Sequence, residues 1–159
     1  RDCSTRPPSG SCFAFEFSNV RNRPAPLTTF RMSSGRIPKK ARWLADPDLL
    51  RQVALNLLQN AWRATEGQAK PRVTLRAAEE ELEGTLHWHL ALKDNGCGIP
   101  SDDLTRVFDP FFTTFGGGTG LGLAVCHRIV VAHGGLLFLE SEPGKGTTVH
   151  LRLPAPAHL

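Results

Sequence analysis

Cysteine is scarce in this sequence, and its usual functional arrangements are missing. The four cysteines form no C-x-x-C pair, which argues against a zinc site. Four are also too few for a disulfide framework in a chain of 159 residues. We therefore interpret Cys3, Cys12, Cys97 and Cys126 as free thiols in a reducing compartment, and we expect a cytoplasmic location.

Long apolar runs are missing as well. No segment is long enough to span a bilayer and no signal peptide is recognisable, so the chain is expected to be soluble even if its parent protein is anchored in a membrane. Positive charge is not concentrated either, because the formal net charge is +4 and no run exceeds two adjacent basic residues. A solvated basic tail is favoured over a nucleic-acid-binding arm, and no nucleic-acid partner is expected.

The chain divides near residue 27. Residues 1–27 combine several prolines with serine, arginine and glycine, and are predicted to form a linker or poorly ordered lead-in with one short strand at 13–17. Residues 28–159 are predicted to form one domain. The overall content of 40% hydrophobic and 21% charged residues is typical of a globular protein.

Hydrophobic periodicity predicts the elements of this domain. Asp46 and Pro47 form a helix start signal ahead of apolar residues at helical spacing, and Gly67 ends that run. A second helix is predicted over 121–133. Strands are predicted at 28–32, 41–45, 72–78, 85–93, 136–140 and 147–153, with an acidic connection at 79–83 and a loop at 94–120. This order lacks regular β-α-β spacing, which favours a two-layer α/β sandwich with one mixed sheet covered by about three helices.

The first candidate functional segment lies on the helix after Asp46. Asn56 and Asn60 are four residues apart and share one face, and Arg63 lies one turn further on. Two amides on an otherwise apolar helix are costly unless a partner satisfies them. An amide oxygen suits a magnesium ion that keeps most of its waters, and an arginine suits a phosphate. A helix whose polar residues simply face water would show the same pattern.

The second segment, D-N-G-C-G-I-P, begins at Asp94 directly after a predicted strand. A carboxylate at a strand end, followed by Gly96 and Gly98, suits a ligand pressed against the backbone. Asp94 could accept a hydrogen bond from an exocyclic amine such as that of adenine. A tight turn is the competing interpretation, because Asp-Asn-Gly makes one readily.

Glycines dominate the third segment, G-G-G-T-G-L-G-L over residues 116–123. They lead into a predicted helix whose first backbone N–H groups could bind phosphate, and the alternative is a flexible surface loop. The spacing fits neither a P-loop nor a Rossmann fingerprint. Two further segments are V-F-D-P-F-F-T-T over 107–114, which suits either a lid hinge or core packing, and the turn G-K-G-T-T over 144–148.

Together these segments resemble the N, G1, F, G2 and G3 boxes of sensor histidine kinases. The boxes read N-L-L-Q-N-A, D-N-G-C-G-I-P, F-D-P-F-F-T-T, G-T-G-L-G-L and G-K-G-T-T, in this order. Each box is weak alone, but five in order are specific, and the resemblance covers residues 41–153. It implies an ATP-binding catalytic domain, an α/β sandwich with a mobile lid over the ATP site. The same fold serves gyrase and heat-shock chaperone ATPases.

The resemblance also implies roles for single residues around ATP. Asn60 would ligate Mg²⁺, with Asn56 and Arg63 beside the phosphates. Asp94 would read the adenine amine, supported by Thr147. The base would also lie beside Gly96 and Gly98.

The lid and the glycine-rich loop would complete the site. Phe111 and Phe112 would anchor a lid over residues 113–119, which starts at Thr113. Phe115 stands in this lid where many relatives carry lysine. The phosphates would be held by Gly118, Thr119, Gly120, Leu121 and Gly122.

Phosphoryl transfer is favoured over hydrolysis. In gyrase-type ATPases a glutamate four residues before the magnesium asparagine serves as general base. Here that position is Asn56, and an amide cannot take a proton at neutral pH. Transfer to a histidine needs less from the domain, because imidazole is already a nucleophile near pH 7. The sequence therefore predicts a histidine kinase catalytic domain that uses Mg-ATP. The alternatives are a nucleotide-binding regulatory module without transfer and a gyrase-type ATPase.

The phosphorylated histidine is expected on another domain. None of the six histidines sits in the H-E-x-x-[NP] setting of the family's phosphoacceptor helix. The expected partners are the phosphoacceptor helical domain of the parent protein and a response-regulator receiver domain. The parent protein is expected to be homodimeric. His87 and His89 alternate on a predicted strand and are interpreted as solvent-face residues, not metal ligands. His133 suits a helix C-terminus.

Overall fold

One sheet and three helices form the described part of the computed structural model, which comprises residues 29–34 and 45–155. The predicted linker 1–27, its strand at 13–17 and nearly all of the predicted strand 41–45 lie outside these residues. In chain order the elements are β1 (Thr29–Ser34), α1 (Pro47–Ala64), β2 (Arg72–Leu82), β3 (Thr85–Asp94), α2 (Ser101–Leu104), α3 (Gly122–Ala132), β4 (Leu136–Glu142) and β5 (Gly146–Pro154).

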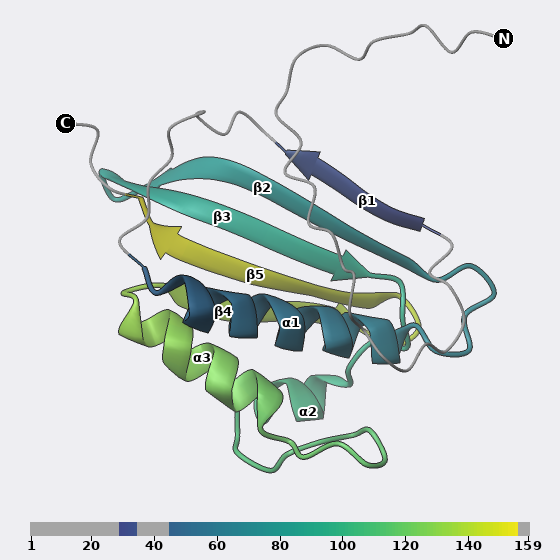
Figure 1. Cartoon of the computed structure of the whole chain (residues 1–159). Coiled ribbons are helices and arrows are strands. Elements are labelled where there is room, and N and C mark those ends of the chain that lie inside the picture. Colours follow the sequence, from purple (N-terminus) through teal and green to yellow (C-terminus); the bar gives the residue numbers. More distant parts are fainter. Residues whose placement is uncertain (1–28, 35–44, 156–159) are drawn as a thin grey trace, which may run out of the picture.

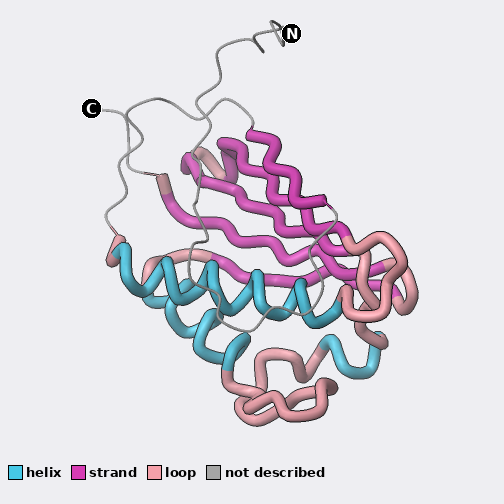
Figure 2. The backbone as a smooth tube through the Cα atoms, turned by 45° about the vertical axis from the view of Figure 1, so that its right-hand side comes forward, coloured by secondary structure: helices cyan, strands magenta, loops and turns pink. Residues whose placement is uncertain are grey.

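The sheet forms one layer and the helices form the other (Figures 1 and 2). Its five strands follow the order β1-β2-β3-β5-β4, with β1 parallel to β2 and all other neighbours antiparallel. α1 and α3 pack against each other and against the same face of the sheet. The predicted two-layer sandwich with a mixed sheet is therefore confirmed. Among the described residues, no helix combines the length and apolar character that a membrane crossing requires.

Local signals set the start of α1. The Asp46 carboxylate accepts hydrogen bonds from the N–H groups of Asp48, at 2.9 Å, and Leu49, at 3.2 Å. Pro47 occupies the first turn, where a missing N–H costs nothing. The Asp46 N–H itself donates to Nε2 of His133, whose Nδ1 lies 2.7 Å from the Ile129 carbonyl oxygen. His133 thus joins the end of α3 to the start of α1, with its ring proton on Nδ1.

The core lies between the helices and the inner face of the sheet. Apolar side chains at helical spacing on α1 and α3 meet every second residue of the strands, and their burial provides the main stabilisation. The buried members are Val53, Leu57, Ala61, Cys126, Ile129 and Val130 from the helices and Val73, Leu92, Leu137, Val149, Leu151 and Leu153 from the strands. The core therefore fixes α1, β3 and β5 relative to one another.

Two boundaries differ from the sequence prediction. β2 runs through the predicted acidic connection as far as Leu82, and the turn falls at Glu83 and Gly84, which both have positive φ. Within this acidic stretch, Glu80 is accommodated on the strand because its carboxylate pairs with Arg152, at 2.9 Å and 3.2 Å. The predicted loop 94–120 also contains the short helix α2.

Candidate functional site

A cavity of about 230 Å³ lies between α1, the adjoining ends of β3 and β5, and the lid segment 113–119. Most residues that the sequence singled out line it, although they come from five separate segments. They are Asn56, Asn60, Arg63, Asp94, Gly98, Phe112, Thr113, Gly118, Thr119, Gly120, Gly122 and Thr147. Gly96, Phe111 and Leu121 do not line the cavity.

Asp94 is a buried carboxylate in the wall of this cavity. It ends β3 and is only 4% exposed. Its Oδ1 accepts hydrogen bonds from the N–H groups of Gly96, at 2.8 Å, and Thr147, at 3.2 Å. Burial raises the pKa of Asp94, and these two hydrogen bonds partly offset that effect. Its other carboxylate oxygen makes no hydrogen bond to another described residue, so it is available to a donor on a ligand.

The two glycines after Asp94 serve close packing of the backbone. A Cβ on Gly96 would lie 2.3 Å from the carbonyl oxygen of Ala64, at the end of α1. A Cβ on Gly98, whose φ is +71°, would lie 2.1 Å from the carbonyl oxygen of Glu142, at the end of β4. Gly96 is thus buried against α1, not exposed to the cavity, and Gly98 reaches both β4 and the cavity.

Apolar side chains that the sequence analysis did not single out form part of the cavity wall. Ile99, Leu139 and Val149 line it beside Asp94. Leu139 and Val149 lie on the core-facing side of β4 and β5, so strand alternation would have pointed to them. Ile99 sits in an irregular loop, where no periodic signal exists. The wall beside Asp94 is therefore suited to a flat, apolar group.

The polar face of α1 forms the opposite side of the cavity. Asn60 is partly buried, and its side chain makes no hydrogen bond within the described part of the chain. The side-chain nitrogen of Asn56 lies 3.5 Å from the carbonyl oxygen of Gly122, at the start of α3. Arg63 is exposed and has no ion pair among the described residues. The amide of Asn60 and the guanidinium of Arg63 are thus both free to contact a ligand.

The two ends of the lid are joined by backbone contact. The Phe111 N–H donates to the carbonyl oxygen of Gly120, at 3.0 Å. A Cβ on Gly120 would lie 2.3 Å from the carbonyl carbon of Phe111, so only glycine permits this approach. Phe111 has a φ of +69° and the residue is 76% exposed, so its backbone, not its ring, holds the lid. The Phe112 ring lines the cavity beneath the Arg106 guanidinium, which lies 4.6 Å from the ring centroid.

The lid itself is organised by Thr113 and Phe115. Thr113 Oγ1 lies 3.2 Å from both the nitrogen and the carbonyl oxygen of Phe115, and the Gly118 N–H donates to the same oxygen. Phe115 lines the cavity. Directly after the lid, α3 begins at Gly122 without a side-chain cap, so its first N–H groups point toward whatever lies before the helix.

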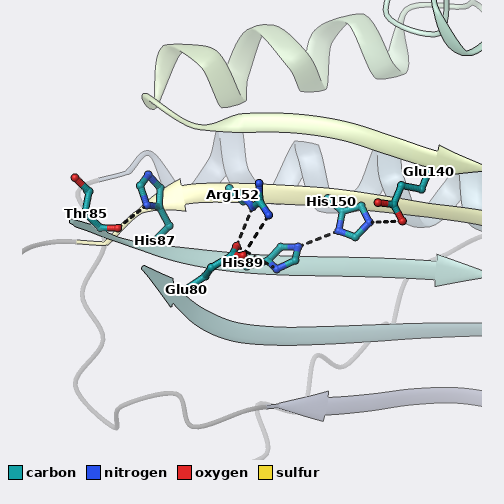
Figure 3. A network of polar contacts seen from close by, with 7 residues as sticks. All are labelled: Glu80, Thr85, His87, His89, Glu140, His150 and Arg152. Carbon is teal, nitrogen blue, oxygen red and sulfur yellow. Dashed lines mark hydrogen bonds and ion pairs between the residues drawn. The ribbon is translucent and has the colours of Figure 1, made fainter. Parts of the chain in front are cut away.

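A second group of polar side chains lies on the sheet face away from the helices (Figure 3). His89 Nε2 is 2.9 Å from His150 Nδ1, and each ring has a glutamate 3.5 Å from its other nitrogen: Glu80 for His89 and Glu140 for His150. His89 is thus placed on the predicted face but is mostly buried by its neighbours, with 23% of its side chain exposed. Among the described residues, no cluster of three or more His, Cys, Asp or Glu could hold a metal ion.

Known proteins are similar to this chain in both sequence and fold. The family model "Histidine kinase-, DNA gyrase B-, and HSP90-like ATPase" matches residues 45–157. Sporulation kinase E of Bacillus subtilis (strain 168) is 37% identical over 136 residues, which are 86% of this chain and 18% of that protein. Sensor histidine kinase ZraS of Escherichia coli (strain K12) is 46% identical over 110 residues, which are 69% of this chain and 22% of that protein. The chain thus spans about a fifth of the length of these relatives.

Solved structures give the same result. The mycobacterial sensor histidine kinase MprB has a TM-score of 0.63 and 30% identity, with 79% of this chain and 80% of that chain covered. Full-length ShkA in complex with AMPPNP has a TM-score of 0.64 and 30% identity, with 80% of this chain and 26% of that chain covered.

The fold and the cavity define an α/β-sandwich domain of the nucleotide-binding type. The chain belongs to the family of histidine kinase-, DNA gyrase B- and HSP90-like ATPases, and within it to the catalytic domains of sensor histidine kinases.

Proposed function

We propose that this domain binds Mg-ATP in the cavity and transfers the γ-phosphoryl group to a histidine on a separate domain of its parent protein. A response-regulator receiver domain would then take the group from that histidine. The observation that carries the proposal is Asp94, a buried carboxylate with one oxygen open to a cavity that free polar groups and a glycine-rich lid surround. The complex of the related ShkA with AMPPNP supports it.

The adenine base would lie in the part of the cavity nearest Asp94. A carboxylate with an unused oxygen accepts a hydrogen bond from the exocyclic amine of adenine, which guanine replaces with an acceptor oxygen. Ile99, Leu139 and Val149 would pack against the flat base. The raised pKa of Asp94 reflects the loss of water that also strengthens its hydrogen bond to a ligand.

The phosphates would lie between the polar face of α1 and the start of α3. The uncapped first turn of α3 offers backbone N–H groups to a phosphate, and Arg63 offers a guanidinium that has no ion pair among the described residues. The side-chain amide of Asn60, which has no hydrogen-bond partner among the residues that the structure describes, fits a magnesium ion that keeps its other positions for phosphate oxygens and water. Such an ion, when bound, would neutralise charge on the phosphates.

The transfer step would depend on positioning and charge stabilisation. An imidazole nitrogen of the incoming histidine forms a bond to the γ-phosphorus, the bond to the bridging oxygen breaks, and ADP leaves. Asn56 stands where gyrase-type ATPases carry the general base for water, and its side-chain nitrogen lies 3.5 Å from the Gly122 carbonyl oxygen. Hydrolysis is therefore slow, which preserves ATP until the acceptor histidine arrives.

A nucleotide-binding module without transfer is the second candidate, and Phe115 favours it. This aromatic side chain lines the cavity from the lid and cannot neutralise a phosphate. The exposed Arg63 on the other side of the cavity is the cation that would have to replace such a contact.

Two measurements test the proposal. Calorimetry with a non-hydrolysable ATP analogue should show binding that magnesium strengthens and that Asp94→Ala abolishes. Incubation with γ-labelled ATP and the phosphoacceptor domain of the same parent should label that domain. Binding without labelling would favour the nucleotide-binding module without transfer. Rapid steady-state hydrolysis would favour the gyrase-type ATPase. No binding would refute the proposal.

A further inference from the structure

Ser141 on β4 joins three separate segments next to the cavity. Its Oγ accepts a hydrogen bond from the Ile99 N–H at 2.8 Å, and lies 3.1 Å from the Gly146 carbonyl oxygen and 2.8 Å from Thr147 Oγ1. The side chain is partly buried and points to the same face of the sheet as Leu137 and Leu139. One hydroxyl therefore links the loop after β3, the strand β4 and the start of β5.

Each of the three partners of Ser141 belongs to a segment that contacts Asp94. Thr147 donates its N–H to Asp94 Oδ1, and Ile99 belongs to the loop whose Gly96 N–H donates to the same oxygen. Gly146 is pressed against the backbone of Asp94, since a Cβ there would lie 2.2 Å from the Asp94 carbonyl oxygen. Removing the Ser141 hydroxyl would therefore loosen both segments that donate to Asp94 Oδ1.

The hydroxyl of Ser141 also determines how the Thr147 hydroxyl can meet a ligand. Ser141 has one proton and two acceptors in range, the Gly146 oxygen and Thr147 Oγ1. If Ser141 donates to Thr147, the Thr147 proton is free to point into the cavity that Thr147 lines. If Ser141 donates to Gly146, Thr147 donates to Ser141 and offers the cavity only lone pairs. Without Ser141, this pairing of the two hydroxyls is lost.

We infer that Ser141 is a positioning residue for base recognition, which acts through Asp94 and Thr147 to favour adenine over guanine. The inference rests on the proposed nucleotide site. Adenine presents an amine donor beside a ring-nitrogen acceptor, and guanine presents a carbonyl acceptor beside an N–H donor. A carboxylate held at a fixed position repels the guanine oxygen, and discrimination is therefore sensitive to small displacements of Asp94 or Thr147.

The test compares ADP and GDP binding by calorimetry for the wild type and three variants. Ser141→Ala removes the hydroxyl, and Ser141→Thr keeps it. Thr148→Val is the matched control, because Thr148 lies on the opposite face of β5 and its hydroxyl makes no hydrogen bond within the described part of the chain. The melting temperature without nucleotide is measured for each protein.

We expect Ser141→Ala to weaken ADP binding about tenfold, which is on the order of one hydrogen bond between the protein and the base, and GDP binding much less. The ratio of ADP to GDP affinity should fall, Ser141→Thr should restore it, and Thr148→Val should leave it unchanged. An unchanged ratio of ADP to GDP affinity in Ser141→Ala, which includes equal losses for both nucleotides, would overturn the inference while leaving the nucleotide site intact. Failure of the wild type to bind ADP would refute the proposed function, and this inference with it.

Discussion

His89 and His150 face each other ring nitrogen to ring nitrogen, with 2.9 Å between Nε2 of His89 and Nδ1 of His150. The two rings are stacked with their centroids 5.2 Å apart. At this distance one nitrogen must donate and the other must accept, so only one proton can lie between them. Full protonation of both rings would place two N–H groups against each other. The pair therefore limits how many protons this face of the sheet can bind.

The stability of the domain should consequently depend on pH through His89. Burial, reinforced by the charges of His150 and Arg152 and opposed by Glu80, holds the pKa of His89 below its usual value of 6.5. The unfolded chain then binds the proton more readily, so this contribution to stability is present above the unfolded value and is lost as the pH falls through the lower folded value. We expect the free energy of unfolding to fall between about pH 8 and about pH 5, and to fall less in His89→Gln.

Urea unfolding across this pH range is the measurement. His87→Gln is the control on the same strand, because the one hydrogen bond of the His87 ring among the described residues is to the Thr85 carbonyl oxygen. An identical pH dependence in His89→Gln and the wild type would contradict the assignment.

Replacing Asp94 by asparagine should separate binding from stability. The amide keeps an oxygen for the N–H groups of Gly96 and Thr147 but turns a donor toward the ligand, so ATP affinity should fall about 100-fold. Burial raises the pKa of Asp94, so its contribution to stability is present at acid pH and is lost as the pH rises through the folded value. At neutral pH the nucleotide-free Asp94→Asn variant should therefore be at least as stable as the wild type. Calorimetry measures the ATP affinity and urea unfolding measures the stability of the nucleotide-free variant. A large loss of stability would contradict this argument.

Alanine at Gly98 should be far more costly than alanine at Gly144. Both residues have positive φ, +71° for Gly98 and +77° for Gly144. A Cβ added at Gly98 would lie 2.1 Å from the Glu142 carbonyl oxygen, whereas a Cβ added at Gly144 would have no atom within 4 Å. Gly144→Ala should destabilise by about 1 kcal/mol from backbone strain, and Gly98→Ala by roughly 3 kcal/mol because the clash adds to it. Denaturant unfolding gives both values. Equal losses would mean that the loop after β3 shifts freely away from β4.

Removal of the Asn60 amide should abolish the effect of magnesium on nucleotide binding. Asn60→Ala should bind ATP equally well with and without the ion, at the affinity that the wild type shows without it. Gln52→Ala is the control, since Gln52 is exposed on the same helix and does not line the cavity. Titration of ATP with and without magnesium measures this, and a retained magnesium dependence in Asn60→Ala would exclude Asn60 as the ligand.

The sequence predicted those parts of the fold that local chemistry determines. Asp46 and Pro47 start α1 through contacts within three residues, and alternation on β3 follows directly from its apolar positions. The end of β2 was misplaced because the partner that accommodates Glu80 is Arg152, which lies far along the chain. No sequence pattern around Glu80 predicts its pairing with Arg152.

The candidate site shows the same division. The motifs identified residues that meet around one cavity, because the motif positions and the fold belong to one family. They did not distinguish Gly96, which packs on Ala64, from Gly98, which also lines the cavity. No sequence pattern singles out Ser141, because it is a single serine in a strand. Its role depends on hydrogen bonds to Ile99 and Thr147, which lie on other segments.

The hydrogen bond between Phe111 and Gly120 has a further consequence for how this fold can diversify. Because the two residues meet directly, the segment between them is a closed loop whose ends coincide whatever its length. Each doubling of such a loop costs only about 0.6 kcal/mol in closure entropy. Insertions, deletions and exchanged sequences can therefore accumulate there without disturbing α1, the sheet or Asp94. The hydrogen bond thus separates the length of the lid from the position of the base pocket beside Asp94.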